Sequence, residues 1–521
     1  MTKRLAVLCF AIAPMLLTGI GPMRAQDFDL PPMLDGENAP AASDTGIGPA
    51  PTADEDADVA TVPDVGAAPP QIDDIPLPDI AVGEIPPIED EADADTVAQQ
   101  GEAESGEAGP PILPIGRTSS LHLETRGFRN EDRQGEDRFA GRFSAHWFGR
   151  GTVSDNLSIL FNLRSRAGWR ESRGFRAEDD INLDVQELAA AWDTGNNLLL
   201  EAGRINVRNG VALGFNPTDW FKADSLVTID SQDPGDRREE RLGTVVVSAA
   251  TSLGSTLVQA GFRPDISAAR DTVVTDADIV GLNLDRTNPS PAFYAKLSPN
   301  LGGNISLTGN VLVENGRLGG GAEVSGTLGN NLVLYGEAFI QHRLNLAAEA
   351  LEDGTGSAAF RSRIGAADGY ETAGQLAIGG TYSLPEAIAK TEDISLSLEY
   401  HYNGAGLTGR QLSALAGAAG ADRAAAGRVR AFAARAQEPL ARHQVFARFA
   451  WNDFLGDADF SAIAYYVPDD RSALAQIAAS YPYNDNVEIS LRAFSVFGSD
   501  TSVYGSNPLR NSIQLAVKYT F

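Results

Sequence analysis

The 521-residue sequence is poor in the residues that support redox, metal or nucleotide chemistry. Its single cysteine, Cys9, lies in an apolar stretch near the N-terminus, so the rest of the chain has no disulfide framework and no thiolate metal site. The five histidines have no spacing typical of a metal site, and we find no phosphate-binding glycine loop and no nucleic-acid-binding pattern. We therefore expect no cofactor, no metal, no nucleic-acid partner and no enzymatic activity.

The N-terminal apolar stretch is too short to be a convincing membrane-spanning helix. It runs from Leu5 to Ile20, follows the basic residues Lys3 and Arg4, and is followed by the small residue Ala25. A basic start, an apolar centre and a small residue at the end are typical of a secretory signal peptide. We predict a signal peptide over residues 1–25 and an exported chain.

Residues 26–116 lack basic residues altogether. They contain 22 Asp or Glu, no Lys or Arg, and 15 of the 28 prolines. Low hydrophobicity with charge of one sign does not allow a chain to bury enough surface to offset its conformational entropy. We predict a disordered acidic Pro-rich spacer here. Most of the net charge of −29 belongs to this segment, because residues 117–521 carry only −10.

From residue 117 onward, apolar and polar residues alternate in segments of about ten. In the last of these segments Ile513, Leu515, Val517, Tyr519 and Phe521 share one face, and polar residues occupy the other. This pattern is typical of a strand in a transmembrane β-barrel, with its apolar face toward lipid. A soluble β-sandwich can show the same alternation, so the connections between strands must distinguish the two.

Short turns rich in Asn, Gly and Asp alternate with longer, variable connections, as expected for the two ends of a membrane barrel. We predict eighteen strands, with a range of 16–20, because alternation is weak in two of them and residues 277–284 could add another. Both termini then lie at the short-turn end, which places the spacer in the periplasm. The predicted strands are 118–127, 139–150, 157–166, 181–192, 198–208, 243–252, 256–264, 291–298, 304–314, 319–327, 332–343, 371–383, 393–403, 442–453, 458–467, 473–482, 487–496 and 511–521.

The C-terminus carries a second signal. Val517, Tyr519 and Phe521 lie at alternate positions and the chain ends on the aromatic residue. This ending resembles the C-terminal signature of bacterial outer-membrane proteins, which their barrel-assembly machinery reads. The alternative is an ordinary last strand. We expect outer-membrane lipids and the assembly machinery as partners, and a spacer over residues 26–116 could bind peptidoglycan or a periplasmic protein.

The alternation also predicts which charged residues face the lumen. Basic residues outnumber acidic ones on this face, which favours a mild preference for anions. The alternative is a solvated wall whose charges pair with one another. The inward candidates for selectivity are Arg142, Arg164, Arg166, Arg448, Arg492, Lys518, Glu399 and Glu488, and the same face holds Arg126, His146, Asn162, Glu124, Asp184 and Glu337.

The connection over residues 209–242 is the best candidate for a constriction. It is the third long connection, and it combines aromatic residues with charges of both signs. The Asn-Pro pair at its start favours a turn, after which Thr218 or Asp219 could cap a short helix. An exposed loop packed on its neighbours is the alternative. The constriction candidates are Asn216, Asp219, Trp220, Arg237, Arg238 and Glu240.

The connection over residues 404–441 is rich in alanine and arginine, a composition that favours helices. Such a helix could cover the mouth of the barrel and attract anions, or the segment could form a flexible lid. A solvated charged face is the simpler interpretation of its arginines.

The stretch from Arg204 to Val247 contains Gly-Arg-x-Asn-x-Arg-x-Gly, Asn-Pro-Thr-Asp-Trp-Phe and Arg-Leu-Gly-Thr-Val. It resembles a group of proteobacterial outer-membrane barrel proteins of porin-like type, a group with no established substrate. The match covers about forty residues, and elsewhere the similarity is one of pattern. The resemblance implies a location and a fold, and it leaves the transported solute open.

Eighteen strands leave room for an aqueous channel. We therefore predict an outer-membrane porin-like channel for passive diffusion of small hydrophilic solutes, with the lumen narrowed by the loop 209–242. Two alternatives stay open at this point. One is an export pore for an anionic polysaccharide, and the other is a structural or adhesion barrel with an occluded lumen.

Overall fold

The computed structural model describes residues 119–171, 174–175, 180–267, 280–367, 369–385, 393–454 and 456–521. The predicted signal peptide and acidic spacer lie outside the described residues. None of the helices in these ranges is both long and apolar enough to cross a membrane.

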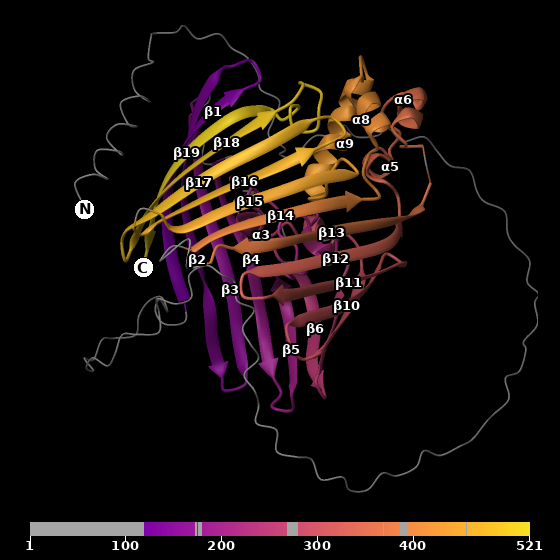
Figure 1. Ribbon diagram of the computed structural model, residues 1–521. Coiled ribbons are helices and arrows are strands. Elements are labelled where there is room, and N and C mark those ends of the chain that lie inside the picture. The colour runs from indigo at the N-terminus through magenta and orange to yellow at the C-terminus, as the bar shows by residue number, and fades with distance from the viewer. Residues whose placement is uncertain are drawn as a thin grey trace, which may run out of the picture. The chain divides into compact units, whose positions relative to one another are not determined.

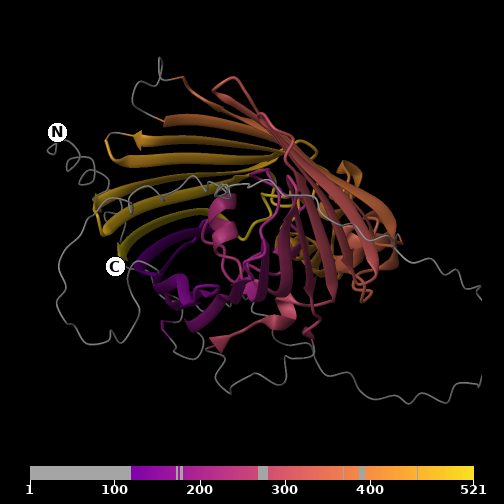
Figure 2. The same ribbon diagram turned by 90° about the horizontal axis from the view of Figure 1, so that it is seen from below.

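Eighteen strands form the wall of a closed antiparallel barrel (Figure 1). Each wall strand pairs with the next along the chain, and β19 pairs with β1, where Thr520 lies opposite His122. The ring of strands is seen from below in Figure 2. The predicted class of fold and the predicted number of strands are both confirmed. One further strand, β8 (Val280–Gly281), lies within the suspected range 277–284, but it pairs in parallel with β4 and is not part of the ring.

The wall strands agree closely with the alternating segments of the sequence. Their bounds are β1 (Ser119–Asp132), β2 (Asp137–Ser154), β3 (Leu157–Arg170), β4 (Ile181–Asp193), β5 (Leu198–Ile205), β6 (Thr244–Leu253), β7 (Thr256–Arg263), β9 (Ala292–Pro299), β10 (Ile305–Glu314), β11 (Arg317–Leu328), β12 (Leu332–Arg343), β13 (Glu371–Ser383), β14 (Asp393–Asn403), β15 (His443–Phe454), β16 (Ala458–Val467), β17 (Ser472–Asn484), β18 (Val487–Phe497) and β19 (Leu509–Thr520).

The first hairpin is longer than predicted. The sequence suggested a loop over residues 128–138, but β1 and β2 continue into this range and pair as far as Glu131 and Asp137. The segment carries charges at successive positions, so it shows no apolar alternation. Alternation is required only where one face of a strand meets an apolar environment, so a strand that continues beyond it can be polar on both faces.

The fifth strand is shorter than predicted, because the chain leaves the wall after Ile205. Gly203 pairs in register with Ala189 and Val246. Its φ of 138° favours glycine, and a Cβ at this position would lie 2.4 Å from the carbonyl oxygen of Leu188. The glycine therefore permits close approach of two wall strands just before the chain turns inward.

The two faces of the wall have opposite character. Large apolar side chains are exposed on the outside, as at Val247 (57%) and Leu398 (60%). Charged and amide side chains are buried on the inside, as at Glu337 (2%), Glu399 (1%) and Gln476 (3%). A soluble protein arranges these residue types the other way round, whereas a barrel surrounded by lipid requires this arrangement.

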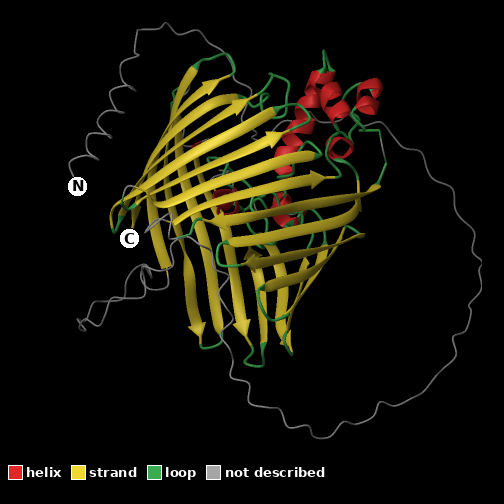
Figure 3. Ribbon diagram, in the orientation of Figure 1, coloured by secondary structure: helices red, strands yellow, loops and turns green. Residues whose placement is uncertain are grey.

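A group of helices lies at the end of the barrel that carries the long connections (Figure 3). The arginine- and alanine-rich connection forms α8 (Gly409–Ala416) and α9 (Asp422–Ala436), in line with its composition. These helices and α5 (Leu346–Ala350) and α6 (Ala358–Arg363) pack around one apolar cluster. We call the four helices the cap.

Candidate functional site: the inner loop of the barrel

The connection between β5 and β6, residues 206–243, lies inside the barrel, where Figure 2 shows a short magenta helix within the ring of strands. We call this connection the inner loop. It contains a 3-10 helix, η1 (Trp220–Lys222), and one α-helix, α3 (Pro234–Glu239). Asp233 begins α3 by accepting a hydrogen bond from the backbone N–H of Gly235 at 2.8 Å, and Pro234 supplies a preset φ at the first helical position.

The first half of the inner loop is attached to two buried carboxylates on neighbouring parts of the wall. Glu399 on β14 accepts backbone N–H groups from Leu213 at 2.5 Å and Gly214 at 2.8 Å. Glu337 on β12 accepts the hydroxyl hydrogen of Thr218 at 2.8 Å. A buried carboxyl group without hydrogen-bond partners is costly, so each of these contacts favours the attached position of the loop. These two acids therefore hold the loop, and Glu399 does not present a free charge to a solute.

Aromatic residues attach the first half of the inner loop to β9 and β12 of the wall. The ring of Trp220 lies 6.0 Å from those of Tyr294 on β9 and Phe339 on β12. Phe221 is 5.8 Å from Tyr294, and the guanidinium of Arg263 lies 4.8 Å from the Phe221 ring. Such contacts combine buried apolar area with favourable ring and cation geometry. They fix η1 against β9 and β12.

Neither predicted capping residue caps η1. Thr218 donates its hydroxyl hydrogen to Glu337, and Asp219 pairs with Arg241 near the end of the loop. Burial raises the pKa of Asp219, but the charges of Arg241 and Arg238 outweigh burial and lower it. A buried carboxylate gains more from a guanidinium than from a helix terminus of one turn, which explains why the capping prediction is wrong.

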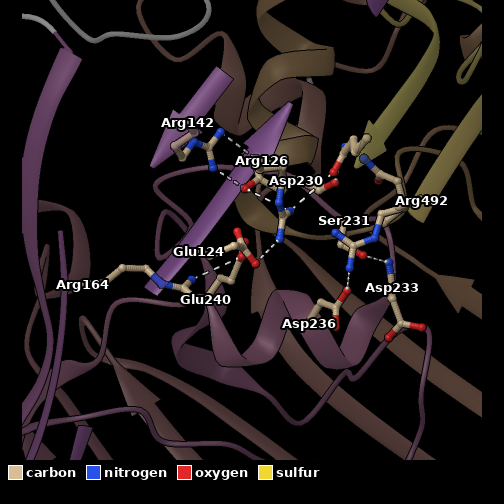
Figure 4. Close-up of polar contacts among 12 residues, drawn as sticks. Glu124, Arg126, Arg142, Arg164, Asp230, Ser231, Asp233, Asp236, Glu240 and Arg492 are labelled. Carbon is tan, nitrogen blue, oxygen red and sulfur yellow. Dashed lines mark hydrogen bonds and ion pairs between the residues drawn. The ribbon is translucent and has the colours of Figure 1, made fainter. Parts of the chain in front are cut away.

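The second half of the inner loop faces a basic strip of wall formed by β1, β2, β3, β15 and β18 (Figure 4). Four acidic residues in this half of the loop pair with arginines of the strip, so the charges on the loop complement those on the wall. The ion pairs are Asp230 with Arg142 and with Arg126 (3.5 Å), Asp233 with Arg448 (3.7 Å), Asp236 with Arg492 (2.6 Å), and Glu240 with Arg164 (3.3 Å).

The remaining wall candidates pair within the wall. Arg166 pairs with Asp184, and both side chains are buried. Lys518 and Glu488 form an ion pair at 3.0 Å with about a third of each side chain exposed. The alternation in the sequence is compatible with free charges that select solutes and with charges that pair within the wall. In the structure, Arg166 and Lys518 pair within the wall. Arg142, Arg164, Arg448 and Arg492 instead pair with acidic residues of the inner loop.

Two other constriction candidates, Asn216 and Arg238, stabilise the inner loop itself. The carbonyl oxygen of Asn216 accepts a hydrogen bond from Lys222 at 2.6 Å. The side-chain nitrogen of Asn216 donates to the carbonyl oxygen of Ala212. Arg238 donates to the carbonyl oxygen of Ala212 at 3.3 Å. Arg237 is half-buried, and burial lowers its pKa. Asn216 and Arg238 therefore shape the loop through contacts within it.

Two residues outside the predicted candidates, Lys222 and Gln437, are central to this arrangement. The ammonium group of Lys222 lies 4.5 Å from the Phe215 ring, and burial lowers the pKa of Lys222 to about 8. Gln437, just after α9, hydrogen-bonds to Arg241 of the inner loop at 2.9 Å. Neither residue belongs to a motif, and each gains its role only from partners distant in the sequence.

Across the described ranges, no group of three or more His, Cys, Asp or Glu lies close enough together to hold a metal ion. No protein-family model matches the sequence, and comparison with curated proteins finds no match.

Comparison with solved structures finds weak similarity to several bacterial proteins. Pseudomonas aeruginosa OccK8 (OprE) matches with a TM-score of 0.44 and 11% identity over 78% of this chain and 98% of that one. The P. aeruginosa outer membrane protein OpdK gives 0.41 and 11% over 77% and 98%, and Acinetobacter baumannii OccAB3 gives 0.42 and 10% over 78% and 98%. With TM-scores below 0.5, these similarities carry no argument about function, which must come from the barrel and its interior.

Proposed function

We propose that this chain is an outer-membrane porin-like channel for passive diffusion of small hydrophilic solutes. The apolar outer face supports a location in lipid, and the polar inner face supports a water-filled lumen. In this proposal the short turns face the periplasm, whereas the long connections and the cap face the outside of the cell. The barrel-assembly machinery would read Val517, Tyr519 and Phe521 during insertion.

The observation that carries the proposal is the attachment of the inner loop to the wall on several sides. Carboxylates of β12 and β14 hold its first half, and arginines of β1, β2, β3, β15 and β18 hold its second half. A loop held in this way occupies part of the lumen at a fixed place. We propose that it narrows the lumen and limits the size of solute that can pass.

The pairing of charges bears on which solutes pass. Asp236 is 42% exposed at its side chain and Arg448 is 39% exposed, so charges of both signs are accessible along the seam between loop and wall. A lumen with mixed, mutually paired charges favours polar solutes over apolar ones and discriminates weakly by sign. This arrangement also disfavours export of an anionic polysaccharide, which requires basic residues that are not already neutralised.

Single-channel recording tests the proposal. The purified full chain would be inserted into planar bilayers, after a gel-shift assay has verified that the barrel is folded and heat-modifiable. We expect steady openings, and a salt gradient should give a reversal potential close to zero. Absence of conductance from a correctly folded barrel would contradict the proposal and would favour a structural or adhesion barrel with an occluded lumen.

A further inference from the structure

The cap and the inner loop meet at Gln437, the residue that follows α9. Its side-chain nitrogen donates to the carbonyl oxygen of Lys222 and to the hydroxyl of Ser225 at 3.1 Å. Its side-chain oxygen accepts from Nε of Arg241 at 3.2 Å and from a terminal nitrogen of the same guanidinium at 2.9 Å. A glutamine amide has two donor hydrogens and two acceptor lone pairs. The whole capacity of the Gln437 side chain is therefore used on the inner loop.

The backbone of Gln437 adopts a conformation that usually belongs to glycine. Its φ of 53° and ψ of 40° lie in the left-handed region, and its N–H closes α9 on the carbonyl oxygens of Ala433 and Ala434. Glycine is the usual residue at this position of a helix terminus, because other residues are strained there. A strained residue whose side chain is fully engaged points to a role for that side chain.

Neighbouring contacts hold both sides of this junction. On the loop side, the N–H of Asp224 donates to the carbonyl oxygen of Arg435 at 2.9 Å. On the wall side, Glu438 accepts from Arg343 on β12 at 2.7 Å and from Gln375 on β13 at 3.0 Å. The residue next to Gln437 is thus fixed to the barrel, so Gln437 can hold the inner loop in a defined place relative to the cap.

We propose that Gln437 is a positioning residue for the constriction, through which the cap sets the place and mobility of the inner loop. The inference rests on the proposed function in that the inner loop is taken to line the conducting path. The wall arginines bind the acidic second half of the loop. Gln437 instead joins both ends of the segment 222–241, so a displacement of α9 would be transmitted to the inner loop.

Two variants of the full chain test this role against a matched control. Gln437→Ala removes the amide, and Gln437→Gly removes it while suiting the left-handed conformation, so strain and hydrogen bonding are separated. Gln411→Ala is the control, because Gln411 is a glutamine of the cap whose side chain bonds Thr408 in the capping box of α8. The measurements are open-channel current noise in single-channel records and hydrogen exchange of the amides in 219–242.

For both Gln437 variants we expect more current noise than in the unmodified chain. The inner-loop amides should also exchange faster by roughly tenfold, because several hydrogen bonds are lost. Gln411→Ala should leave both measurements unchanged. The proposal is overturned if Gln437→Gly matches the unmodified chain in noise and in exchange. An unmodified chain without conductance would count against the proposed channel alone, since the exchange measurement tests Gln437 independently.

Discussion

Asp230, in the middle of the inner loop, accepts two hydrogen bonds from the guanidinium of Arg142 on β2, one of them at 2.9 Å. The two residues are 88 positions apart in the sequence. A bidentate pair of this kind fixes both distance and orientation. The carbonyl oxygen of Asp230 also accepts a hydrogen bond from Gln514 on β19 at 2.8 Å. This one residue therefore joins the inner loop to strands on both sides of the junction between β1 and β19, where the barrel closes.

Replacing Asp230 by Asn should loosen the second half of the inner loop. The change removes the charge that Arg142 and Arg126 share, and breaking a largely buried ion pair costs roughly 3 kcal/mol. We expect noisier openings and a reversal potential shifted toward anions, because two arginines become uncompensated. Asp485→Asn, in an exposed short turn, is the control. Unchanged noise and reversal potential in the Asp230 variant would show that this pair does not hold the loop.

Acidification should affect the inner loop in two opposite steps. Burial raises the pKa of Glu240 above its usual 4.5, whereas Arg142 outweighs the effect of burial and lowers the pKa of Asp230 below 3.8. A raised carboxyl pKa means that the folded state gains stability as pH falls through it, and a lowered pKa means that stability is lost at more acid pH. Packing of the loop should therefore improve slightly on acidification and then weaken below the usual carboxyl range.

Hydrogen exchange of the loop amides as a function of pH, corrected for intrinsic exchange rates, measures both steps. In Glu240→Gln the first step should be smaller, because burial also raises the pKa of Asp233 in the same loop, while the second step should remain. A single step in the unmodified chain, or a Glu240→Gln profile identical to it, would contradict the assignment of the first step to Glu240.

Gly203→Ala should destabilise the whole barrel. The added Cβ would lie 2.4 Å from the carbonyl oxygen of Leu188 and 2.6 Å from Cα of Ala189, and the φ of 138° would be strained for alanine. The expected loss in the free energy of unfolding is roughly 3 kcal/mol. Gly151→Ala on β2 is the control, because a Cβ there meets nothing within 4 Å. Urea unfolding followed by tryptophan fluorescence would compare the two, and equal midpoints would refute the prediction.

The wall of the barrel was predictable because one face of each strand must be apolar while the other is polar, and this leaves a period of two in the sequence. The same reasoning placed Arg142, Arg492 and Glu399 on the inner face. It failed in the first hairpin, where both faces of the extended strands are polar. The separate prediction that Asp219 caps a helix was wrong because its partner Arg241 is fixed only by the folded loop.

The inner loop shows why the rest could not be read from the sequence. Trp220, Asp230 and Gln437 gain their contacts from segments that lie far away in the chain, and no local period in the sequence encodes those contacts. Charge composition indicated that the loop carries both signs. Which acid meets which arginine depends on the register and closure of the barrel.

Deleting Phe521 should reduce insertion into the outer membrane more than it reduces stability. Phe521 is exposed on the outside of the barrel (54%) and ends the predicted assembly signal with Tyr519 and Val517. Phe497→Ala is a matched control, because Phe497 is equally exposed (55%). It is the last residue of β18, whereas Tyr519 pairs with the first residue of that strand, Val487. The amount of heat-modifiable barrel in the outer-membrane fraction is the measurement. Equal losses in both variants would argue against a role in assembly beyond apolar surface.

The most direct test of the central claim compares the single-channel conductance of the full chain with that of a variant lacking residues 212–238, after both have passed a heat-modifiability check. Removing these residues takes away the attachments to Glu399, Arg142 and Arg492 while leaving the wall strands intact. We predict steady openings from the unmodified chain and a clearly larger conductance from the deletion variant. Equal conductance in the two folded barrels would contradict a constriction formed by the inner loop.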